Sequence, residues 1–306
     1  MDLTITDASI PSLAGKHAVI TGGSSGIGLA CVKCLLAHDI AQILLLDIKP
    51  PSEELPPQVT YRECDASSWT QLRDAFKTTA RVDLVFANTG GGQGGDPLAD
   101  RFDEAAGELQ EPCRVGIDMN YQSALNTAVL GIRAMRSQGT GGSVVFTSSA
   151  TAYSSQTGLP VYGSQKLAVI GLVRSWRHVL VKENITVNAV APATTATAMV
   201  PKGALDVLGA KGLEVSDAKQ VGLALVYSAV ANEERRVEAY GHEKDEDNES
   251  TPGRWNGRVI MTIGDRFSEI EEPMERLKGK WFGERNLADF RHGQRLIEDL
   301  QRQQPR

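Results

Sequence analysis

A tyrosine and a lysine are spaced four residues apart near the middle of the chain, in the segment YGSQK that ends at Lys166. The segment opens a helical pattern, so Tyr162 and Lys166 are predicted to lie one turn apart on the same helix face. A free phenol has a pKa of about 10, too high for a base at neutral pH, and a lysine ammonium within about 4–6 Å lowers that pKa. The pair therefore predicts general acid–base catalysis, although helices also bring tyrosine and lysine to this spacing by chance.

Ser149 lies 13 residues before Tyr162, at the end of the apolar run GSVVFTSS. This run is predicted to be a buried strand, and the C-terminal ends of parallel strands face the ligand crevice. Ser149 and Tyr162 are therefore expected to reach one substrate oxygen, which the serine polarises while the phenol exchanges a proton. Ser148 is expected to point to the other side of the strand. These roles fit the interconversion of an alcohol and a carbonyl compound.

A glycine-rich turn follows the first predicted strand, at TGGSSGIG from Thr21 to Gly28. Glycines let backbone N–H groups approach a pyrophosphate, and the N-terminus of the next helix adds positive potential. The spacing differs from the common G-x-G-x-x-G fingerprint, and a tight turn without a ligand is the alternative. The residues predicted to hold the dinucleotide here are Gly22, Ser24, Ser25, Gly26, Ile27 and Gly28.

Acidic and amide side chains follow the next three predicted strands. Asp47 ends the second strand 19 residues after Gly28, where a carboxylate binds ribose hydroxyls and repels a 2′-phosphate, so NAD is predicted in preference to NADP. Lys49, two residues later, could pair with such a phosphate, so NADP stays an alternative cofactor. Asp65 is predicted either to accept from the adenine amino group or to cap the helix that follows. Asn88 is predicted either to bridge strands under the cofactor or to be structural.

The elements that must position these residues alternate between short apolar runs and longer helical patterns. The predicted strands are HAVITGG, QILLLDIK, VTYREC, VDLVFANTG, GSVVFTSS, ITVNAVAP and GRVIMTIG. Helices are predicted over about 27–38, 68–80, 114–137 and 162–182. Fully apolar strands that alternate with helices indicate a parallel sheet covered on both faces. The predicted fold class is therefore α/β, a doubly wound, Rossmann-like parallel sheet of about seven strands.

One domain is predicted over residues 1–265, followed by a C-terminal extension over 266–306. Within the domain, residues 231–253 carry eight acidic and three basic side chains, which predicts a solvated surface loop. Residues 194–213 are rich in small and apolar side chains and nearly uncharged. This second stretch predicts either a cover over an apolar ligand or ordinary amphipathic packing.

The composition is that of a globular protein with a large core: 306 residues, 41% hydrophobic and 23% charged, with a net charge of −6. The acidic balance argues against a nucleic-acid partner, which needs a basic surface. The chain contains no run of 18 apolar residues, so no membrane span is predicted, and its first residues lack the pattern of a secretory signal. Cys31 and Cys34 are expected to be helix-core residues, without a metal or redox role. We expect a cytoplasmic protein that binds no metal.

These motifs together resemble those of the short-chain dehydrogenase/reductase family, over about residues 16–197 and again over 257–264. TGGSSGIG is similar to the family's cofactor turn, and Asn88-Thr89-Gly90 to its Asn-Ala-Gly motif. The family's catalytic residues match Asn120, Ser149, Tyr162 and Lys166. The segment that passes over the nicotinamide matches VNAVAP and the residues after it, with Pro192, Thr195 and Thr197.

The resemblance implies a role for each of these residues. Tyr162 would exchange the substrate proton while hydride passes to or from the nicotinamide, and Ser149 would polarise the substrate oxygen. Lys166 would hold the nicotinamide ribose and lower the pKa of Tyr162. Asn120 would hold a water that links Lys166 to solvent, and Asn88 and Gly90 would lie beside the cofactor. Two positions depart from the family pattern, where Thr89 stands in place of Ala and Ala193 in place of Gly.

The family's mobile substrate lid corresponds to residues 194–213. Its apolar side chains favour a bulky hydrophobic alcohol or ketone, and the sequence as a whole resembles fungal members that act on terpenoid or polyketide hydroxyls in secondary metabolism. The expected substrate contacts are Ser149, Tyr153, Leu159 and Met199. A homodimer or homotetramer is implied, because helices matching 114–137 and 160–182 pack between subunits in many members.

Three other functions stay open on this fold, because fold alone does not fix chemistry. One is an epimerase or dehydratase without net redox change, and another is an NADP-dependent ketoreductase. The third is a catalytically idle dinucleotide-binding regulator, against which the presence of both Tyr162 and Lys166 argues.

Overall fold

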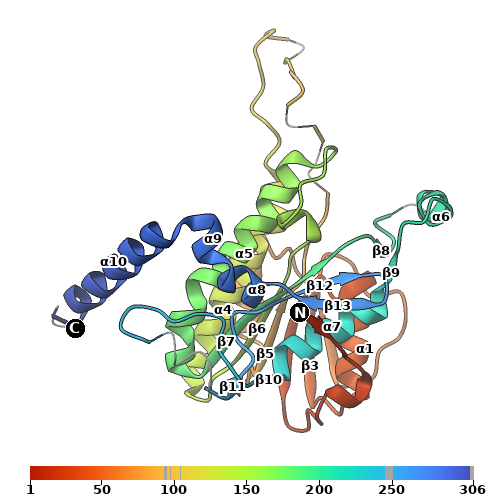
Figure 1. The fold of residues 1–306 in the computed structure, drawn as a ribbon. Helices are drawn as coiled ribbons and strands as arrows, with labels where there is room; N and C mark the ends of the chain where they lie inside the picture. Colours follow the sequence, from red (N-terminus) through yellow and green to blue (C-terminus); the bar gives the residue numbers. More distant parts are fainter. Residues whose placement is uncertain (93–94, 97, 104, 201, 245–250, 304–306) are drawn as a thin grey trace.

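The computed structural model describes residues 1–92, 95–96, 98–103, 105–200, 202–244 and 251–303. Nine strands among these residues form one sheet, in the order β1-β13-β12-β7-β6-β5-β2-β3-β4. Figure 1 shows this sheet with helices packed around it. The strands from β12 to β4 pair in parallel and are the apolar runs predicted from the sequence, which confirms the doubly wound α/β fold. Their bounds are His17–Thr21 (β2), Gln42–Asp47 (β3), Val59–Glu63 (β4), Leu84–Ala87 (β5), Gly142–Thr147 (β6), Ile185–Pro192 (β7) and Val259–Ile263 (β12).

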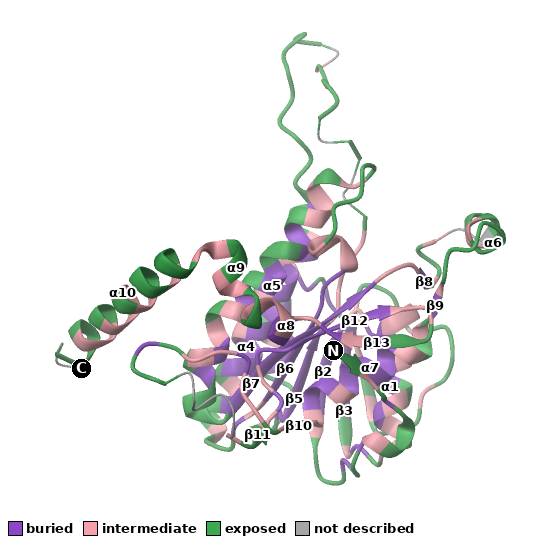
Figure 2. Ribbon diagram, viewed as in Figure 1, coloured by how far each residue is buried: buried purple, intermediate pink, exposed green. Residues whose placement is uncertain are grey.

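Helices cover both faces of the sheet. Successive strand residues point to opposite sides, so a continuous apolar strand has apolar side chains to bury on each face. On β2, Val19 belongs to one hydrophobic core and Ile20 to the other. Helices α2, α4 and α5 close the core under Val19, and α1 and α7 close the core under Ile20. Figure 2 shows the strands as a buried band between these layers. The helix bounds are Gly26–Ala37 (α1), Trp69–Phe76 (α2), Ser123–Gln138 (α4), Pro160–Leu180 (α5) and Ala218–Val230 (α7).

The long helix predicted over 114–137 is interrupted near its start. It consists of a short α-helical turn, α3 (Val115–Ile117), a π-helical segment, η2 (Asp118–Gln122), and then α4. A π-helical turn holds one more residue than an α-helical turn and is frequent at functional sites. Here it carries Asn120. A plain helical periodicity cannot reveal such an insertion.

The sheet continues past the boundary predicted at residue 265. Strand β13 (Arg266–Glu269) turns back from β12 with Ile263 paired to Arg266, and Gly264 allows this tight turn with a φ of +58°. Strand β1 (Asp2–Leu3) pairs with β13 at the edge. The C-terminal segment beyond β13 forms α8 (Glu271–Arg276), α9 (Lys278–Phe282) and α10 (Glu284–Gln303).

The acidic stretch is docked onto the domain at Glu233 and Glu238, where a solvated loop was expected, and its residues 245–250 lie outside the described part of the chain. Its ends pair as β10 (Asn232–Glu233) and β11 (Gly253–Arg254). The Glu233 side chain is 5% exposed and bonds the Arg258 guanidinium at 2.9 Å. The Glu238 side chain is 12% exposed and forms an ion pair with Arg177. These two acids pair with buried cations that are distant in sequence. The composition of the segment alone therefore predicted their environment wrongly.

Several segments stand away from the sheet in Figure 1: the chain between β5 and α3, helix α6, and α10. Helix α6 (Lys202–Ala210) lies in the predicted lid, and its described side chains are exposed or half-exposed, so the covering role of 194–213 stays a prediction. In the described part of the chain, no helix is both long and apolar enough to cross a bilayer. The remaining short elements are η1 (Asp7–Ser9), η3 (Ala150–Ala152), η4 (Val181–Glu183), β8 (Thr195–Ala196) and β9 (Ser216–Asp217).

Candidate active site

Ser149 follows the C-terminal end of β6 and caps the 3₁₀ turn η3. Its side-chain oxygen accepts hydrogen bonds from the N–H of Thr151 at 3.2 Å and from the Thr151 hydroxyl at 2.9 Å. Ser149 also lies close enough to the phenol of Tyr162 to lower its pKa. Ser148 points the other way, and its hydroxyl donates to the carbonyl of Lys166 at 2.8 Å. The end of β6 therefore presents one serine to Tyr162 and uses the other to hold α5.

Helix α5 starts at Pro160, whose fixed φ suits a first helical turn, and carries Tyr162 and Lys166 one turn apart. The Lys166 ammonium lies 5.7 Å from the centroid of the Tyr162 ring and donates to the carbonyl of Thr147 at 3.0 Å. Burial lowers the pKa of Lys166 to about 8. Burial raises the pKa of Tyr162, and the nearby Ser149 opposes that rise. Desolvation thus sets the direction of the Tyr162 pKa, and the lowering that was expected from Lys166 is not found.

Asn120, on the π-helical segment, is fully buried beside these residues. Its Oδ1 accepts from the N–H of Gly91 at 3.0 Å, and its amide nitrogen lies 2.9 Å from the side-chain amide of Gln165. A Cβ added at Gly90 would lie 3.0 Å from Nζ of Lys166 and 3.1 Å from Oδ1 of Asn120. A side chain at position 90 would therefore press on both Asn120 and Lys166, and glycine leaves these two groups in place.

The glycine turn has the features of a pyrophosphate site. Gly22 has a φ of +68°, and its carbonyl accepts from Nδ2 of Asn88 at 2.9 Å. A Cβ at Gly28 would collide with that carbonyl oxygen, so α1 begins this close to the turn only with glycine there. The Ser25 side chain makes no capping hydrogen bond, which leaves the first N–H groups of α1 available to a ligand. The Ser24 hydroxyl oxygen is buried and has no hydrogen-bond partner among the described residues. This turn therefore fits a phosphate group, which would accept a hydrogen bond from that hydroxyl.

Asp47 and Asp65 hold different positions relative to this turn. The Asp47 carboxylate is fixed beside it, because Oδ2 accepts from the N–H of Ser24 at 3.0 Å and Oδ1 from the N–H of Lys49 at 3.3 Å. Asp65 is exposed, and its Oδ1 accepts from the N–H and the hydroxyl of Ser67 at 2.9 and 2.8 Å. Asp65 thus shapes the chain that leads into α2, whereas its contact with adenine stays a prediction.

Thr147, which the sequence did not single out, connects these parts. Its hydroxyl donates to Oδ1 of Asn88 at 2.8 Å, and its carbonyl accepts from Lys166. Because Asn88 also donates to Gly22, it bridges the ends of β2, β5 and β6. The signal that could have identified Thr147 is its place as a polar residue at the end of a buried strand, directly before two serines.

The segment after β7 returns toward the glycine turn. Pro192 ends β7, and Thr195 is buried, with its hydroxyl donating to the carbonyl of Ala193 at 3.0 Å. The Thr197 side chain lies against the turn, because a Cβ at Gly26 would be 3.1 Å from its Cγ2. The predicted nicotinamide segment is thus close to the predicted pyrophosphate turn.

The predicted substrate contacts have different environments. The Tyr153 hydroxyl donates to Oε1 of Glu271 at 2.7 Å, which connects it to the C-terminal segment. Leu159 is half-buried directly before α5, and Met199 is 62% exposed before α6. Their contact with a substrate stays a prediction.

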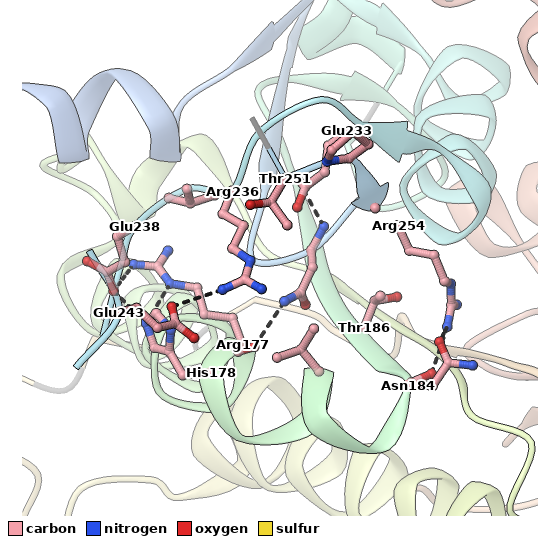
Figure 3. Close-up of a pocket in the computed structure, with 15 residues that line it drawn as sticks. Arg177, His178, Asn184, Thr186, Glu233, Arg236, Glu238, Glu243, Thr251 and Arg254 are labelled. Atoms are coloured by element: carbon pink, nitrogen blue, oxygen red, sulfur yellow. Dashed lines mark hydrogen bonds and ion pairs between the residues drawn. The ribbon is translucent and has the colours of Figure 1, made fainter. Parts of the chain in front are cut away.

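A cavity of about 210 Å³ lies elsewhere, between the end of α5 and residues 233–243 and 251–256 (Figure 3). None of the predicted catalytic residues lines it. Its charges are largely paired within the chain, Arg177 with Glu238 and Arg236 with Glu243. Across the described ranges, histidine, cysteine and acidic residues form no group of three or more that could hold a metal ion.

Comparisons with known proteins agree with this geometry. A family model described as short chain dehydrogenase matches residues 16–206. The short-chain dehydrogenase/reductase ATR7 of Stachybotrys chlorohalonatus is 44% identical over 313 residues, covering 95% of each chain. The short-chain dehydrogenase/reductase prx4 of Penicillium roqueforti is 45% identical over 299 residues, covering 94% of this chain and 89% of the relative. These relatives confirm the expected likeness to fungal members.

A solved structure shows the same fold. It is a short-chain type dehydrogenase/reductase from Mycobacterium marinum, with a TM-score of 0.63 and 20% identity, over 85% of this chain and 98% of that one. The chain therefore belongs to the short-chain dehydrogenase/reductase family, whose members are oxidoreductases that use NAD or NADP.

Proposed function

We propose that this protein is an NAD-dependent oxidoreductase that interconverts a secondary alcohol and a ketone on a bulky hydrophobic small molecule. The observation that supports this most directly is the position of Tyr162 between two groups: Ser149 is close enough to lower the pKa of the phenol, and the Lys166 ammonium lies 5.7 Å from the centroid of the phenol ring. A polarising hydroxyl, a proton-exchanging phenol and a nearby cation are what alcohol–carbonyl interconversion requires.

In oxidation, the substrate hydroxyl would lie against Ser149 and Tyr162. Ser149 holds the oxygen, and Tyr162 accepts its proton. Lys166, buried with a lowered pKa, stabilises the resulting phenolate, and Asn120 holds a water through which the proton leaves. The bound dinucleotide supplies the hydride acceptor, or the hydride donor in reduction. In reduction the same residues transfer the proton in the opposite direction.

The preference for NAD rests on Asp47. Its carboxylate is held beside the glycine turn by the N–H of Ser24 at 3.0 Å. A fixed anion there accepts hydrogen bonds from ribose hydroxyls and repels a 2′-phosphate. The Lys49 side chain is exposed two residues later, and it is the cation that would favour NADP instead.

The substrate class rests on the character of residues 194–213 and on the fungal relatives. This segment is nearly uncharged, and its exposed apolar side chains include Met199 and Val207. Because apolar surface is stabilised by contact with apolar ligand surface, a terpenoid or polyketide alcohol or ketone fits it better than a sugar.

The test is a titration of NADH and NADPH with the protein, followed through nicotinamide fluorescence, and then a screen of hydrophobic secondary alcohols. Tight NADH with weak NADPH, and NADH formation with one of the alcohols, is the expected result. Tight NADPH would shift the proposal to an NADP-dependent ketoreductase. Substrate turnover without net change in NADH would replace it with an epimerase or dehydratase.

We also infer a cytoplasmic homodimer or homotetramer. The cysteines at 31, 34, 64 and 113 are all free, which suits a reducing compartment. Helix α5 exposes Leu167 and Val179, in the helix pair that packs between subunits of many family members. Size-exclusion chromatography with light scattering tests the assembly, and a monomer would contradict it.

A further inference from the structure

Helix α10 carries its apolar side chains on the face that its own chain leaves uncovered. Phe290, Gly293, Ile297 and Leu300 are spaced three, four and three residues apart, which places them in one stripe. Phe290 is 55% exposed, Ile297 53% and Leu300 62%. The whole helix contains no buried residue, and it stands clear of the sheet in Figure 1.

The polar face of α10 is the one that contacts the rest of the protein. Glu298 accepts from the N–H of His242 at 3.0 Å, and Asp299 bonds the His242 ring at 2.7 Å. Arg291 lies 3.9 Å from Glu275. An amphipathic helix normally turns its apolar face to the core. In α10 this arrangement is reversed, so the apolar stripe is built for contact outside the chain.

Gly293 lies in the middle of that stripe and of the helix. It has nine helix residues before it and ten after it. A Cβ at this position would meet nothing within 4 Å, so no contact within the chain requires glycine here. Glycine in a helix interior is unfavourable, but it lets a second backbone approach closely.

We propose that α10 is an association arm that pairs with α10 of a second copy of this chain, the two helices crossing at Gly293. A two-fold axis needs a self-complementary patch, and a crossing at the midpoint uses both halves of each helix. The stripe continues into α9, where the Phe282 and Phe290 rings lie 5.8 Å apart and Trp281 is 60% exposed.

Area and charge both favour a second copy. The C-terminal segment has six large apolar side chains that are at least half exposed: Leu277, Trp281, Phe290, Leu296, Ile297 and Leu300. Half of their surface is on the order of 600 Å² per copy, against roughly 800 Å² per partner in a stable interface. The polar flanks of a crossing would add the remainder. The helix has four acidic and four arginine side chains, whereas a helix that lies on an anionic membrane is usually basic.

The proposal is independent of the catalytic assignment, and the test is sedimentation velocity of the full chain and its variants at micromolar concentrations. Ile297→Asp places a charge in the stripe. It is expected to reduce the oligomeric state, from tetramer to dimer or from dimer to monomer, with association weakened at least about tenfold. Ala288→Asp places the same charge at an exposed position of the opposite, polar face and is the matched control, expected to leave the assembly unchanged.

Gly293→Ala distinguishes weakened helix pairing from unfolding of α10 as the cause of weakened association. Alanine favours the helix more than glycine, so the variant should keep or raise helical circular dichroism and still weaken association, because its methyl group separates the crossing backbones. A monomeric wild-type chain, equal effects of Ile297→Asp and Ala288→Asp, or tighter association of Gly293→Ala would each overturn the proposal. Flotation of a monomeric chain with anionic phospholipid vesicles, lost in Ile297→Asp, would overturn it in favour of a membrane surface.

Discussion

The ammonium of Lys166 donates a hydrogen bond to the carbonyl of Thr147 at 3.0 Å, so the cation on α5 is anchored to the last residue of β6. The same strand end leads directly into Ser149, which lies close enough to Tyr162 to lower the pKa of its phenol. One strand end therefore fixes the serine and the lysine together, and Tyr162 lies between them in sequence. This anchoring keeps a charged group in a fully buried position, which lowers the stability of the fold.

Lys166→Met is expected to stabilise the fold at pH 7 by about 3 kcal/mol, the free energy that corresponds to the pKa shift of the buried ammonium. Burial lowers the folded-state pKa to about 8, below the value of about 10.4 in an unfolded chain. The unfolded state therefore binds more protons between these values, so wild-type stability rises with pH across this window. The advantage of the methionine variant should be full below pH 8 and shrink toward pH 10.5. Urea unfolding at pH 7 and pH 10 measures it.

The control for this measurement is Lys33→Met, because the Lys33 side chain is 55% exposed and pairs only with the exposed Glu53 among its described contacts. It should change stability by less than about 1 kcal/mol at both pH values. If Lys166→Met destabilised the fold equally at both pH values, the buried ammonium would not be the cause.

Tyr162→Phe is expected to lower kcat by about 10²–10⁴-fold, the usual contribution of a general acid or base. NADH binding should persist, because only a hydroxyl is removed. In the wild type, the raised pKa of Tyr162 predicts that alcohol oxidation becomes faster as the pH rises above neutral. Initial rates over pH and an NADH titration measure both. Tyr240→Phe, on a partly exposed ring that stacks on His178, is the control and should retain activity.

The sequence was sufficient to predict the parallel core and the proximity of the residues proposed to be catalytic. Buried parallel strands are continuous apolar runs, and their C-terminal ends lie at one edge of the sheet. Ser149 follows such a strand end and Tyr162 begins the next helix, so the two were expected to lie close together at that edge. The edge strand β13 was missed because four residues carry little pattern, although Gly264 marked the turn before it.

Long-range ion pairs were the other part that sequence could not supply. The acids of residues 231–243 looked solvated, but Glu233 is paired with Arg258 and Glu238 with Arg177. No local pattern identifies a partner that lies 25 or more residues away. The π-helical turn at Asn120 was missed for a related reason, since its sequence reads as an ordinary helix.

Asp47→Ala is expected to narrow the preference for NADH over NADPH by at least about fivefold, because one charge–charge repulsion at contact distance costs on the order of 1 kcal/mol even in bulk water. Fluorescence titrations of both cofactors give the ratio. Asp65→Ala is the matched control, because any contact with adenine is common to both cofactors and should leave the ratio unchanged. An unchanged ratio in Asp47→Ala would mean that another residue discriminates between them.

Gly90→Ala is expected to reduce activity strongly with the overall fold retained. The new methyl carbon would lie 3.0 Å from Nζ of Lys166 and 3.1 Å from Oδ1 of Asn120, so both proposed catalytic groups must shift. Small displacements of positioned groups cost about a hundredfold in rate. Gly92→Ala, two residues later, meets nothing within 4 Å and should keep wild-type activity. Equal activities of the two variants would show that the site tolerates the shift.

Glu271→Ala is expected to destabilise the protein by about 3 kcal/mol, because it removes the buried carboxylate that pairs with the half-buried Arg174 and the buried Arg177. The Glu271 side chain is 3% exposed, and it accepts from Nε and Nη2 of Arg174, both at 2.8 Å, and from the Tyr153 hydroxyl at 2.7 Å. Burial alone would raise its pKa, but the bonds from Arg174 and Tyr153 hold the pKa below its usual range. The stabilisation is therefore present at neutral pH and is lost as the pH falls through that lowered value.

Urea unfolding at pH 7 and at acid pH tests this, and the matched control is Glu53→Ala. Glu53 pairs with Lys33 at 2.6 Å, a shorter contact, but its side chain is 42% exposed. A surface pair contributes about 0–1 kcal/mol, because solvent screens it. If the two variants lost equal stability, burial would not govern the strength of these pairs. If Glu271→Ala kept its full deficit in acid, its effect would come from lost packing and not from the carboxylate charge.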